Sequence, residues 1–333
     1  MRNLLKLFLL AMLGVALLFW DAQRLLQAPL PLTAEARFDI PRGQAFATVV
    51  DRLQSQQWLG PARTALYLRL HARFYGLDSQ IKSGEYALLP GLNAIGAVAL
   101  FVSGRTVLYE VRFIEGWTFA QALDAIRRHP QIAQTLTDHR LEAVMAALGE
   151  PDLHPEGQFF PDTYRFERDT TDVTLLRRAL DMQRRVLADE WERRSPGLPY
   201  ADAREALIMA SIIEKETGLE SERQQIAGVF VRRLRLGMRL QTDPTVIYGI
   251  GPTFDGNIRL RDLRTNTPYN TYMRGGLTPT PICLPGRASI HAALHPDDGS
   301  ALFFVSRGDG SHVFSDTLDA HNAAVRRYQL GQP

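Results

Sequence analysis

A glutamate, Glu214, lies in an otherwise strongly apolar stretch, residues 206–218. Apolar residues recur around all sides of the helix that this stretch predicts, and such a helix is buried on most sides. Glu214 shares a face with Leu207, Ala210 and Ser211, because residues three, four and seven positions apart lie together on a helix. Small side chains on that face leave room for a ligand beside the acid. A carboxyl group in partly apolar surroundings keeps its proton to higher pH than in water, as a general acid must.

The same helix allows a purely structural explanation of Glu214. Taken alone, the helix favours a glutamate that pairs with a distant arginine, since ion pairs also perturb pKa values. Asp202 and Glu205 resemble a capping box at the start of the helix, and Gly218 is expected to end it. Glu216 is two residues from Glu214 and therefore points to roughly the opposite side. We do not expect these two acids to act on one bond.

Composition narrows the class of protein. The chain has 333 residues, enough for two domains, and 45% of them are hydrophobic while 22% are charged, which is typical of a globular protein. Lys and Arg number 38 against 36 Asp and Glu, and this near-balance argues against a nucleic-acid-binding protein. The single cysteine, Cys283, excludes an intramolecular disulfide framework and a thiolate zinc cluster.

The N-terminus carries an apolar run over residues 4–20 that is interrupted only by Lys6. Its length and composition predict a single transmembrane anchor. Arg2 and Lys6 favour an N-terminus in the cytoplasm, and Trp20 suits the far interface. A cleaved signal peptide is the alternative, although Phe19 and the residues after it make a poor cleavage site. Both interpretations export the rest of the chain.

Periodicity predicts an α+β fold in which a small module precedes a larger domain. A linker over residues 21–37 leads into the module, residues 38–105. The predicted order of elements in the module is strand, helix, helix, strand and then a further helix. The larger domain, residues 106–333, begins with a strand. It continues with a helical stretch broken at Pro130, a long amphipathic helix over residues 174–193, and the helix that bears Glu214.

Two polar clusters follow that helix. Residues 240–249 are dense in hydrogen-bonding groups and could bind a polyhydroxylated ligand, or could form a loop that caps the next helix through Thr242 or Asp243. Residues 268–272 place two tyrosines beside Asn270. Aromatic rings stack on the apolar faces of sugars, so this cluster suits sugar binding, and an ordered loop over the core is the alternative.

Other patterns give weaker signals. His291 and His295 are four residues apart but lack the glutamate of the zinc-protease motif, and we expect no metal site and no cofactor. The arginines between Arg232 and Arg239 are interpreted as a solvated helix face. No serine nucleophile elbow and no phosphate-binding loop is evident in the sequence.

In order along the chain, several runs of residues resemble the YceG-like (MltG) endolytic murein transglycosylase family. The main runs are residues 210–217, 233–234, 238–249 and 269–272. Supporting runs are residues 115–118, 156–157, 160–164, 285–286, 304–305, 310–314 and 321–322. The chain departs from the family pattern at residues 276–279 and at Leu284.

The resemblance implies a membrane-anchored enzyme of the inner membrane that cuts peptidoglycan strands internally in the periplasm. Residues 1–3 would be a cytoplasmic tip, the module would be LysM-like and bind glycan, and the family's catalytic glutamate maps onto Glu214. Peptidoglycan strands are the expected partner, peptidoglycan synthases are candidate protein partners, and no nucleic acid is expected. Residues that could orient the sugar or the acid are Gln241, Thr242, Asp243, Tyr248, Asn270 and Tyr272.

A single acid is expected to act through a lytic route that forms 1,6-anhydroMurNAc ends and terminates or releases nascent strands. Ordinary glycosidases instead use two carboxylates across the bond. Two alternatives stay open: a muramidase-type hydrolase that uses Asp243 as second carboxylate, and a non-catalytic glycan-binding scaffold for wall synthesis.

Overall fold

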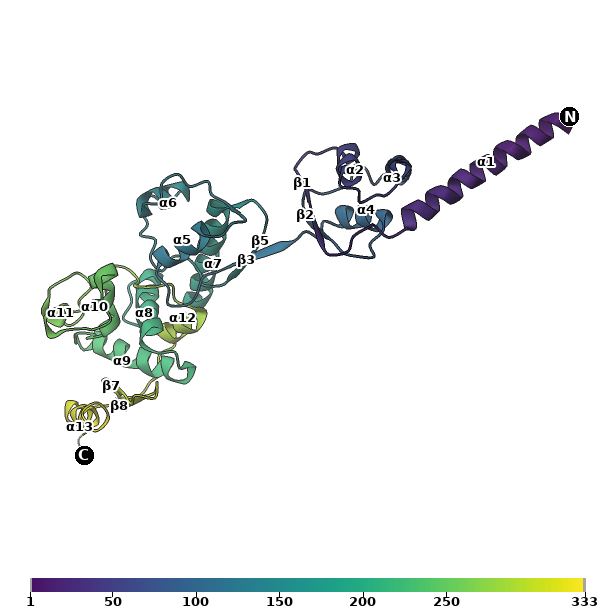
Figure 1. Ribbon diagram of the computed structural model, residues 1–333. Coiled ribbons are helices and arrows are strands. Elements are labelled where there is room, and N and C mark those ends of the chain that lie inside the picture. The colour runs from purple at the N-terminus through teal and green to yellow at the C-terminus, as the bar shows by residue number, and fades with distance from the viewer. Residues whose placement is uncertain (1, 332–333) are drawn as a thin grey trace. The chain divides into compact units, whose positions relative to one another are not determined.

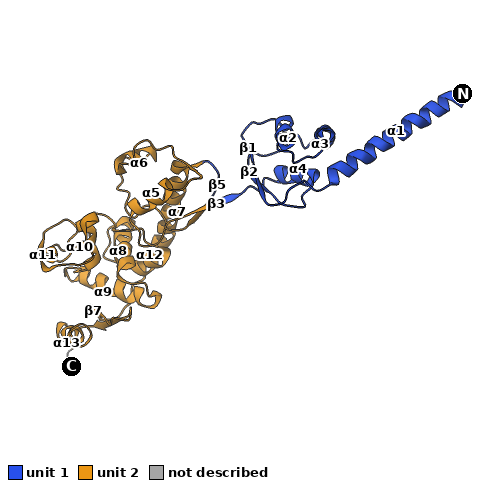
Figure 2. Ribbon diagram, viewed as in Figure 1, with its two compact units in different colours: residues 1–109, 165–169 blue, residues 110–164, 170–333 orange. Residues whose placement is uncertain are grey.

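The chain divides into two units in the computed structural model, which describes residues 2–331. The first unit comprises Met1–Tyr109 with Arg165–Asp169, and the second comprises Glu110–Tyr164 with Thr170–Pro333 (Figure 2). Met1 of the expected cytoplasmic tip and residues 332–333 of the expected catalytic domain lie outside the described residues. The mixed α+β fold class is confirmed.

The first unit contains the strand–helix–helix–strand module that the sequence predicts, followed by a further helix. Its elements are β1 (Ala36–Ile40), α2 (Phe46–Ser55), α3 (Ala62–Phe74), β2 (Gly84–Leu88) and α4 (Ala94–Ser103). The two strands pair antiparallel, with Ala36 opposite Leu88. Their inward side chains Phe38 and Tyr86 contact Phe101 of α4, at ring-centroid distances of 5.7 and 5.0 Å. The module therefore has a hydrophobic core of its own.

The N-terminal helix α1 (Arg2–Gln27) has 26 residues and is long and apolar enough to cross a membrane. It continues through residues 21–27, which we expected to begin the linker. The reason is that its last turns pack on the module. Leu26 is buried there. The carboxylate of Asp21 accepts hydrogen bonds from Arg63 Nε at 2.8 Å and from the Tyr67 hydroxyl at 3.1 Å.

The second unit is mainly helical (Figure 1). The strands from β3 onward form two-stranded pairs, β3 with β5, β4 with β6 in parallel, and β7 with β8 antiparallel. The elements are β3 (Leu108–Arg112), α5 (Phe119–Arg127), β4 (Ile132–Ala133), α6 (Leu141–Ala147), β5 (Thr163–Glu167), β6 (Thr170–Thr171), α7 (Asp172–Glu192), α8 (Ala203–Glu216), η1 (Glu220–Glu222), α9 (Arg223–Arg235), α10 (Asp243–Ile250), η2 (Gly251–Thr253), α11 (Leu260–Arg264), α12 (Arg287–Leu294), β7 (Phe303–Ser306), β8 (His312–Ser315) and α13 (Leu318–Tyr328). The division between the units falls within β3 and β5.

Helix α8 lies at the centre of the second unit, where it packs against α7, α9, α10 and α12 (Figure 1). Every residue over 206–213 is buried, which confirms the prediction of a helix enclosed on most sides. The Asp202 side chain caps its start by accepting the Glu205 N–H at 3.0 Å. The helix ends at Glu216 with Thr217 as its C-cap, one residue before the predicted stop at Gly218.

Candidate active site

A cavity of about 540 Å³ receives the side chain of Glu216 at the end of α8. We call it the Glu216 cavity. Its walls come from elements that are far apart in the sequence: α8, α9, the segment before α10 and the first residue of α10, the loop after α11, β7, β8 and α13. The lining residues are Glu216, Arg233, Leu240, Gln241, Asp243, Tyr272, Phe303, Phe304, Val305, Ser306, His312, Leu318, His321, Asn322, Val325 and Gln329.

Glu216 is held in surroundings that favour its protonated form. Burial raises the pKa of Glu216 to about 7, and the negative charge of Asp243 acts in the same direction. A hydrogen bond from the Thr242 hydroxyl to Glu216 Oε1, and the charges of His312 and Arg233, oppose that rise in pKa. Glu216 therefore carries a proton for much of the time near neutral pH, as a general acid must.

Three of the residues predicted from the sequence meet at this cavity. Gln241 lines it from the segment before α10, Asp243 lines it as the first residue of α10, and Tyr272 lines it from the loop after α11. The Tyr272 hydroxyl donates a hydrogen bond of 2.6 Å to Asp243 Oδ1, which fixes both side chains. The backbone of Gln241 is left-handed, with φ of 53°, and its N–H donates to the Thr271 carbonyl at 3.2 Å. Several donors and acceptors thus surround Glu216.

His312 and Arg233 complete the cavity. The interpretation of the arginine cluster as a solvated helix face is wrong for Arg233, which is only 7% exposed because its guanidinium turns inward to backbone carbonyls. His312 Nδ1 lies 2.7 Å from Glu222 Oε2, and the backbone N–H of His312 donates to Glu222 Oε1 at 2.9 Å. The Glu222 carboxylate therefore orients the His312 ring. Arg233 donates to the carbonyls of Leu302 and Leu240, each at 2.7 Å. The sequence signal for a role at the site was, for both residues, their position in runs that resemble the family.

Glu214 has a different environment from Glu216. It does not line the Glu216 cavity. Its Oε2 accepts the Gly286 N–H at 3.0 Å, and this bond ties the end of α8 to the loop before α12. The side chain of Glu115 lies against the same glycine. Burial and the charge of Glu214 raise the pKa of Glu115. The expectation that Glu214 and Glu216 point to different sides of α8 agrees with these contacts.

Tyr248 faces a second cavity, of about 790 Å³, with mostly apolar walls. Its hydroxyl donates to Glu156 Oε2 at 3.1 Å, and the Phe119 N–H donates to Glu156 Oε1 at 2.9 Å. Burial raises the pKa of Glu156 to about 7, although both hydrogen bonds oppose the rise. Tyr248 is therefore not brought together with Glu216, because α10 turns its side chain away from that of Asp243 at the start of the helix.

Asn270 is buried inside the protein and does not line the Glu216 cavity. Its amide Nδ2 donates to the carbonyls of Asp262, Leu263 and Thr265 at 3.1, 3.1 and 2.7 Å. Its Oδ1 accepts the Tyr272 N–H at 2.9 Å. Asn270 therefore organises the loop that carries Tyr272 and makes its hydrogen bonds within the protein.

We expect Asn270→Ala to lower the free energy of unfolding by about 3 kcal/mol, because it leaves several buried polar groups without a partner. Denaturant unfolding of the purified protein measures this. The matched control is Asn266→Ala, four residues earlier in the chain, whose exposed side chain accepts one hydrogen bond from Arg274. A loss no larger in Asn270→Ala than in the control would contradict the structural role.

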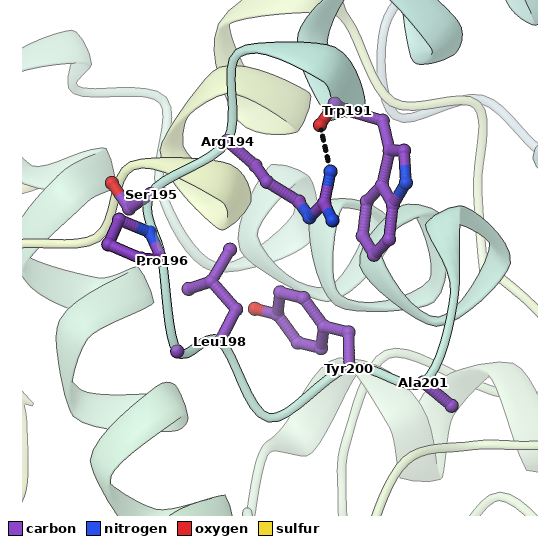
Figure 3. Close-up of a pocket in the computed structure, with 8 residues that line it drawn as sticks. Trp191, Arg194, Ser195, Pro196, Leu198, Tyr200 and Ala201 are labelled. Carbon is purple, nitrogen blue, oxygen red and sulfur yellow. Dashed lines mark hydrogen bonds between the residues drawn. The ribbon is translucent and has the colours of Figure 1, made fainter.

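A third pocket, of about 420 Å³, lies in the connection between α7 and α8 (Figure 3). Arg194 stacks on the Trp191 ring at 4.1 Å and donates to the Trp191 carbonyl at 2.8 Å. The guanidinium thus covers a ring face that could otherwise stack on a sugar. No carboxylate is among the residues that line this pocket in the described part of the chain.

The histidine pair noted in the sequence belongs to an ion-pair network. His291 Nδ1 lies 2.9 Å from Glu190 Oε2, and Glu190 Oε1 accepts a hydrogen bond from Arg287 at 2.8 Å. Potential ligand atoms of Glu190, His291 and His295 lie within 4.8 Å of one another. Since Arg287 and His291 already engage the carboxylate, we assign this cluster no metal role.

Comparison with known proteins shows the family to which this chain belongs. The model of the YceG-like family matches residues 38–327, so the chain belongs to that family, as its motifs indicated. A protein of Bacillus subtilis (strain 168) named endolytic murein transglycosylase is 30% identical over 307 residues, which cover 87% of this chain and 84% of that relative. A Streptococcus pneumoniae (strain D39) protein of the same name is 29% identical over 180 residues, covering 52% of this chain and 32% of the relative. The crystal structure of a YceG-like protein from Listeria monocytogenes superposes with a TM-score of 0.54 at 28% identity, covering 87% of this chain and 99% of that one.

Proposed function

We propose that this protein is an endolytic peptidoglycan lytic transglycosylase, which cleaves the bond between MurNAc and GlcNAc within glycan strands. Membership of the YceG-like family and the names of its relatives support the reaction class. The observation that carries the proposal in this chain is the Glu216 cavity, where a protonatable acid is surrounded by hydrogen-bonding side chains.

We assign the catalytic acid to Glu216 instead of Glu214, where the resemblance mapped it. Glu216 lines a cavity with Gln241, Asp243 and Tyr272, and it has a pKa raised to about 7. Glu214 accepts a backbone hydrogen bond and lies outside that cavity. The original assignment to Glu214 is the alternative, and it makes the opposite prediction for the two glutamine variants.

The reaction needs one acid that later acts as a base. Protonated Glu216 donates its proton to the glycosidic oxygen as the bond from MurNAc C1 to that oxygen breaks. The C6 hydroxyl oxygen of the same MurNAc attacks C1, and its proton passes to the Glu216 carboxylate. The products are a 1,6-anhydroMurNAc end and a free GlcNAc hydroxyl, and Glu216 is protonated again. The Asp243 carboxylate, fixed by Tyr272, stabilises the positive charge that develops at C1.

Product analysis tests the reaction type. Mass spectrometry of purified glycan strands after digestion should find anhydro ends within the original strand length, without new reducing ends. A muramidase-type hydrolase that uses Asp243 to activate water would instead leave reducing ends. A non-catalytic scaffold would bind sacculi and never shorten the strands.

Activity should fall as pH rises through about 7. The protonated form of Glu216 is the proton donor. Above the pKa of Glu216, each further pH unit lowers the protonated fraction about tenfold. Because the folded-state pKa lies above the ordinary value of 4.5, the favourable contribution of Glu216 to stability is complete below pH 4.5 and is lost as pH rises through about 7. Initial rates of glycan cleavage, measured between pH 5 and 9, test the predicted fall in activity. A rate that stays constant up to pH 9 would contradict this assignment.

The first unit is proposed to hold the enzyme at its substrate. We propose that α1 is a single-pass anchor in the inner membrane with its N-terminus in the cytoplasm, since Arg2 and Lys6 precede the apolar run. The second unit is then periplasmic. The strand–helix–helix–strand order supports a LysM-like, glycan-binding assignment for the module. Peptidoglycan synthases are the candidate partners in strand termination.

A further inference from the structure

Helix α3 carries an apolar stripe that none of the described residues covers. Leu66, Leu70 and Phe74 are spaced four residues apart, lie on one face of the helix, and are 55%, 59% and 82% exposed. The opposite face, with Leu68 and Ala72, is buried in the core of the module. One helix face thus stabilises the module while the other presents three large apolar side chains to the surroundings.

Helix α3 packs beside the end of the apolar run of α1. Arg63 and Tyr67, from the first turns of α3, both donate hydrogen bonds to Asp21, which directly follows Trp20 in α1. Figure 1 shows α3 nearly end-on, whereas α1 is seen from its side and runs across the picture, and α3 lies on the side of the first unit from which α1 extends. The two helices therefore cross steeply. When α1 spans a bilayer up to Trp20, α3 lies along the bilayer surface at the level of the headgroups.

The ion pairs of α3 leave its apolar stripe as the feature that would contact lipid. The helix contains Arg63, Arg69, Arg73 and His71 and no acidic residue. Its three arginines pair with Asp21, Asp51 and Asp78, respectively, so the charges beside the stripe balance. In-plane helices bury such an apolar face at the boundary between headgroups and acyl chains.

We propose that α3 docks on the surface of the lipid bilayer through Leu66, Leu70 and Phe74. The inference rests on the proposed anchor, because the anchor brings α3 to the membrane. The docked helix holds the module against the bilayer at a fixed height and orientation, so that the module does not swing freely on α1.

Spin labels on the full-length chain test the docking. Leu70→Cys places a nitroxide in the stripe, Ser55→Cys places one on an exposed polar position of α2, and Leu13→Cys places one within the anchor. Native Cys283 is buried, so the introduced thiol is the accessible one in each folded variant. Each labelled protein is reconstituted into vesicles of phosphatidylethanolamine and phosphatidylglycerol, and collision rates of the label with oxygen and with a water-soluble nickel complex are measured.

The ratio of the collision rate with oxygen to that with nickel is high for a label in lipid and low for one in water. We expect this oxygen-to-nickel ratio at residue 70 to exceed the ratio at residue 55 several-fold and to approach the ratio at residue 13. A ratio at residue 70 equal to that at residue 55, with residue 13 still lipid-like, overturns the docking and leaves the anchor intact. Protection of residue 70 from both reagents means that a protein covers the stripe, which also overturns it. A water-like ratio at residue 13 overturns the anchor, and the docking with it.

Discussion

Glu216→Gln is expected to lower the rate of glycan cleavage by about a thousandfold, whereas Glu214→Gln should retain most of the activity. Removing a general acid typically costs 10²- to 10⁴-fold in rate. At residue 216 the amide keeps the shape of the side chain and can still accept the hydrogen bond from Thr242, but it cannot donate a proton to the glycosidic oxygen. At residue 214 the amide oxygen can still accept the Gly286 N–H.

The measurement is the rate at which anhydro ends appear on purified strands, followed by mass spectrometry for both variants and the wild type. Binding to sacculi and circular dichroism confirm that each variant is folded and still binds glycan. Glu156→Gln is a further control, since Glu156 also has a pKa raised to about 7 but lies in the other cavity. If Glu214→Gln is the inactive variant, the catalytic acid is Glu214 and not Glu216.

Gly157→Ala is expected to destabilise the second unit by about 3–5 kcal/mol, from backbone strain and overpacking together. Gly157 has φ of 77°, a conformation that residues with a Cβ rarely adopt. An added Cβ would lie 2.4 Å from Pro281 Cβ and 3.3 Å from the Cys283 carbonyl oxygen. The proline ring cannot rotate away, so the backbone must move, and Glu156 is adjacent to the site of that movement.

Thermal unfolding of the full chain should show the unfolding midpoint of this variant lowered by about 10 °C. Gly197→Ala separates the two causes, because Gly197 has φ of 70° and nothing within 4 Å of an added Cβ. Strain alone predicts a loss of about 1 kcal/mol there. Equal losses in the two variants would show that the contact with Pro281 is not the main cause.

Local patterns in the sequence were sufficient for the elements and for the family. The spacing of apolar residues predicted the strand–helix–helix–strand module, the enclosed helix α8 and the N-terminal apolar helix. Runs such as residues 238–249 identified the family, which the match over residues 38–327 confirms. These features depend on residues close together in the chain, so a single sequence contains them.

The environment of each acid was decided by tertiary structure. Helical geometry predicted that Glu214 and Glu216 point apart, but a helix that is apolar on all sides does not indicate which side meets a cavity. The far wall of the Glu216 cavity comes from β7, β8 and α13, roughly a hundred residues later, including His312 and Asn322.

The roles of the other predicted site residues also depend on tertiary structure. Tyr248 and Tyr272 both lie in polar clusters, yet Tyr272 lines the Glu216 cavity and Tyr248 lines the other one. Asn270 could have bound a sugar or the backbone, and the carbonyls of a folded loop surround it. The helices, the module and the family could be predicted from the sequence, because they follow from the spacing and order of residues along the chain. Which carboxylate lies in the Glu216 cavity depended on contacts between distant segments, which only the tertiary structure specifies.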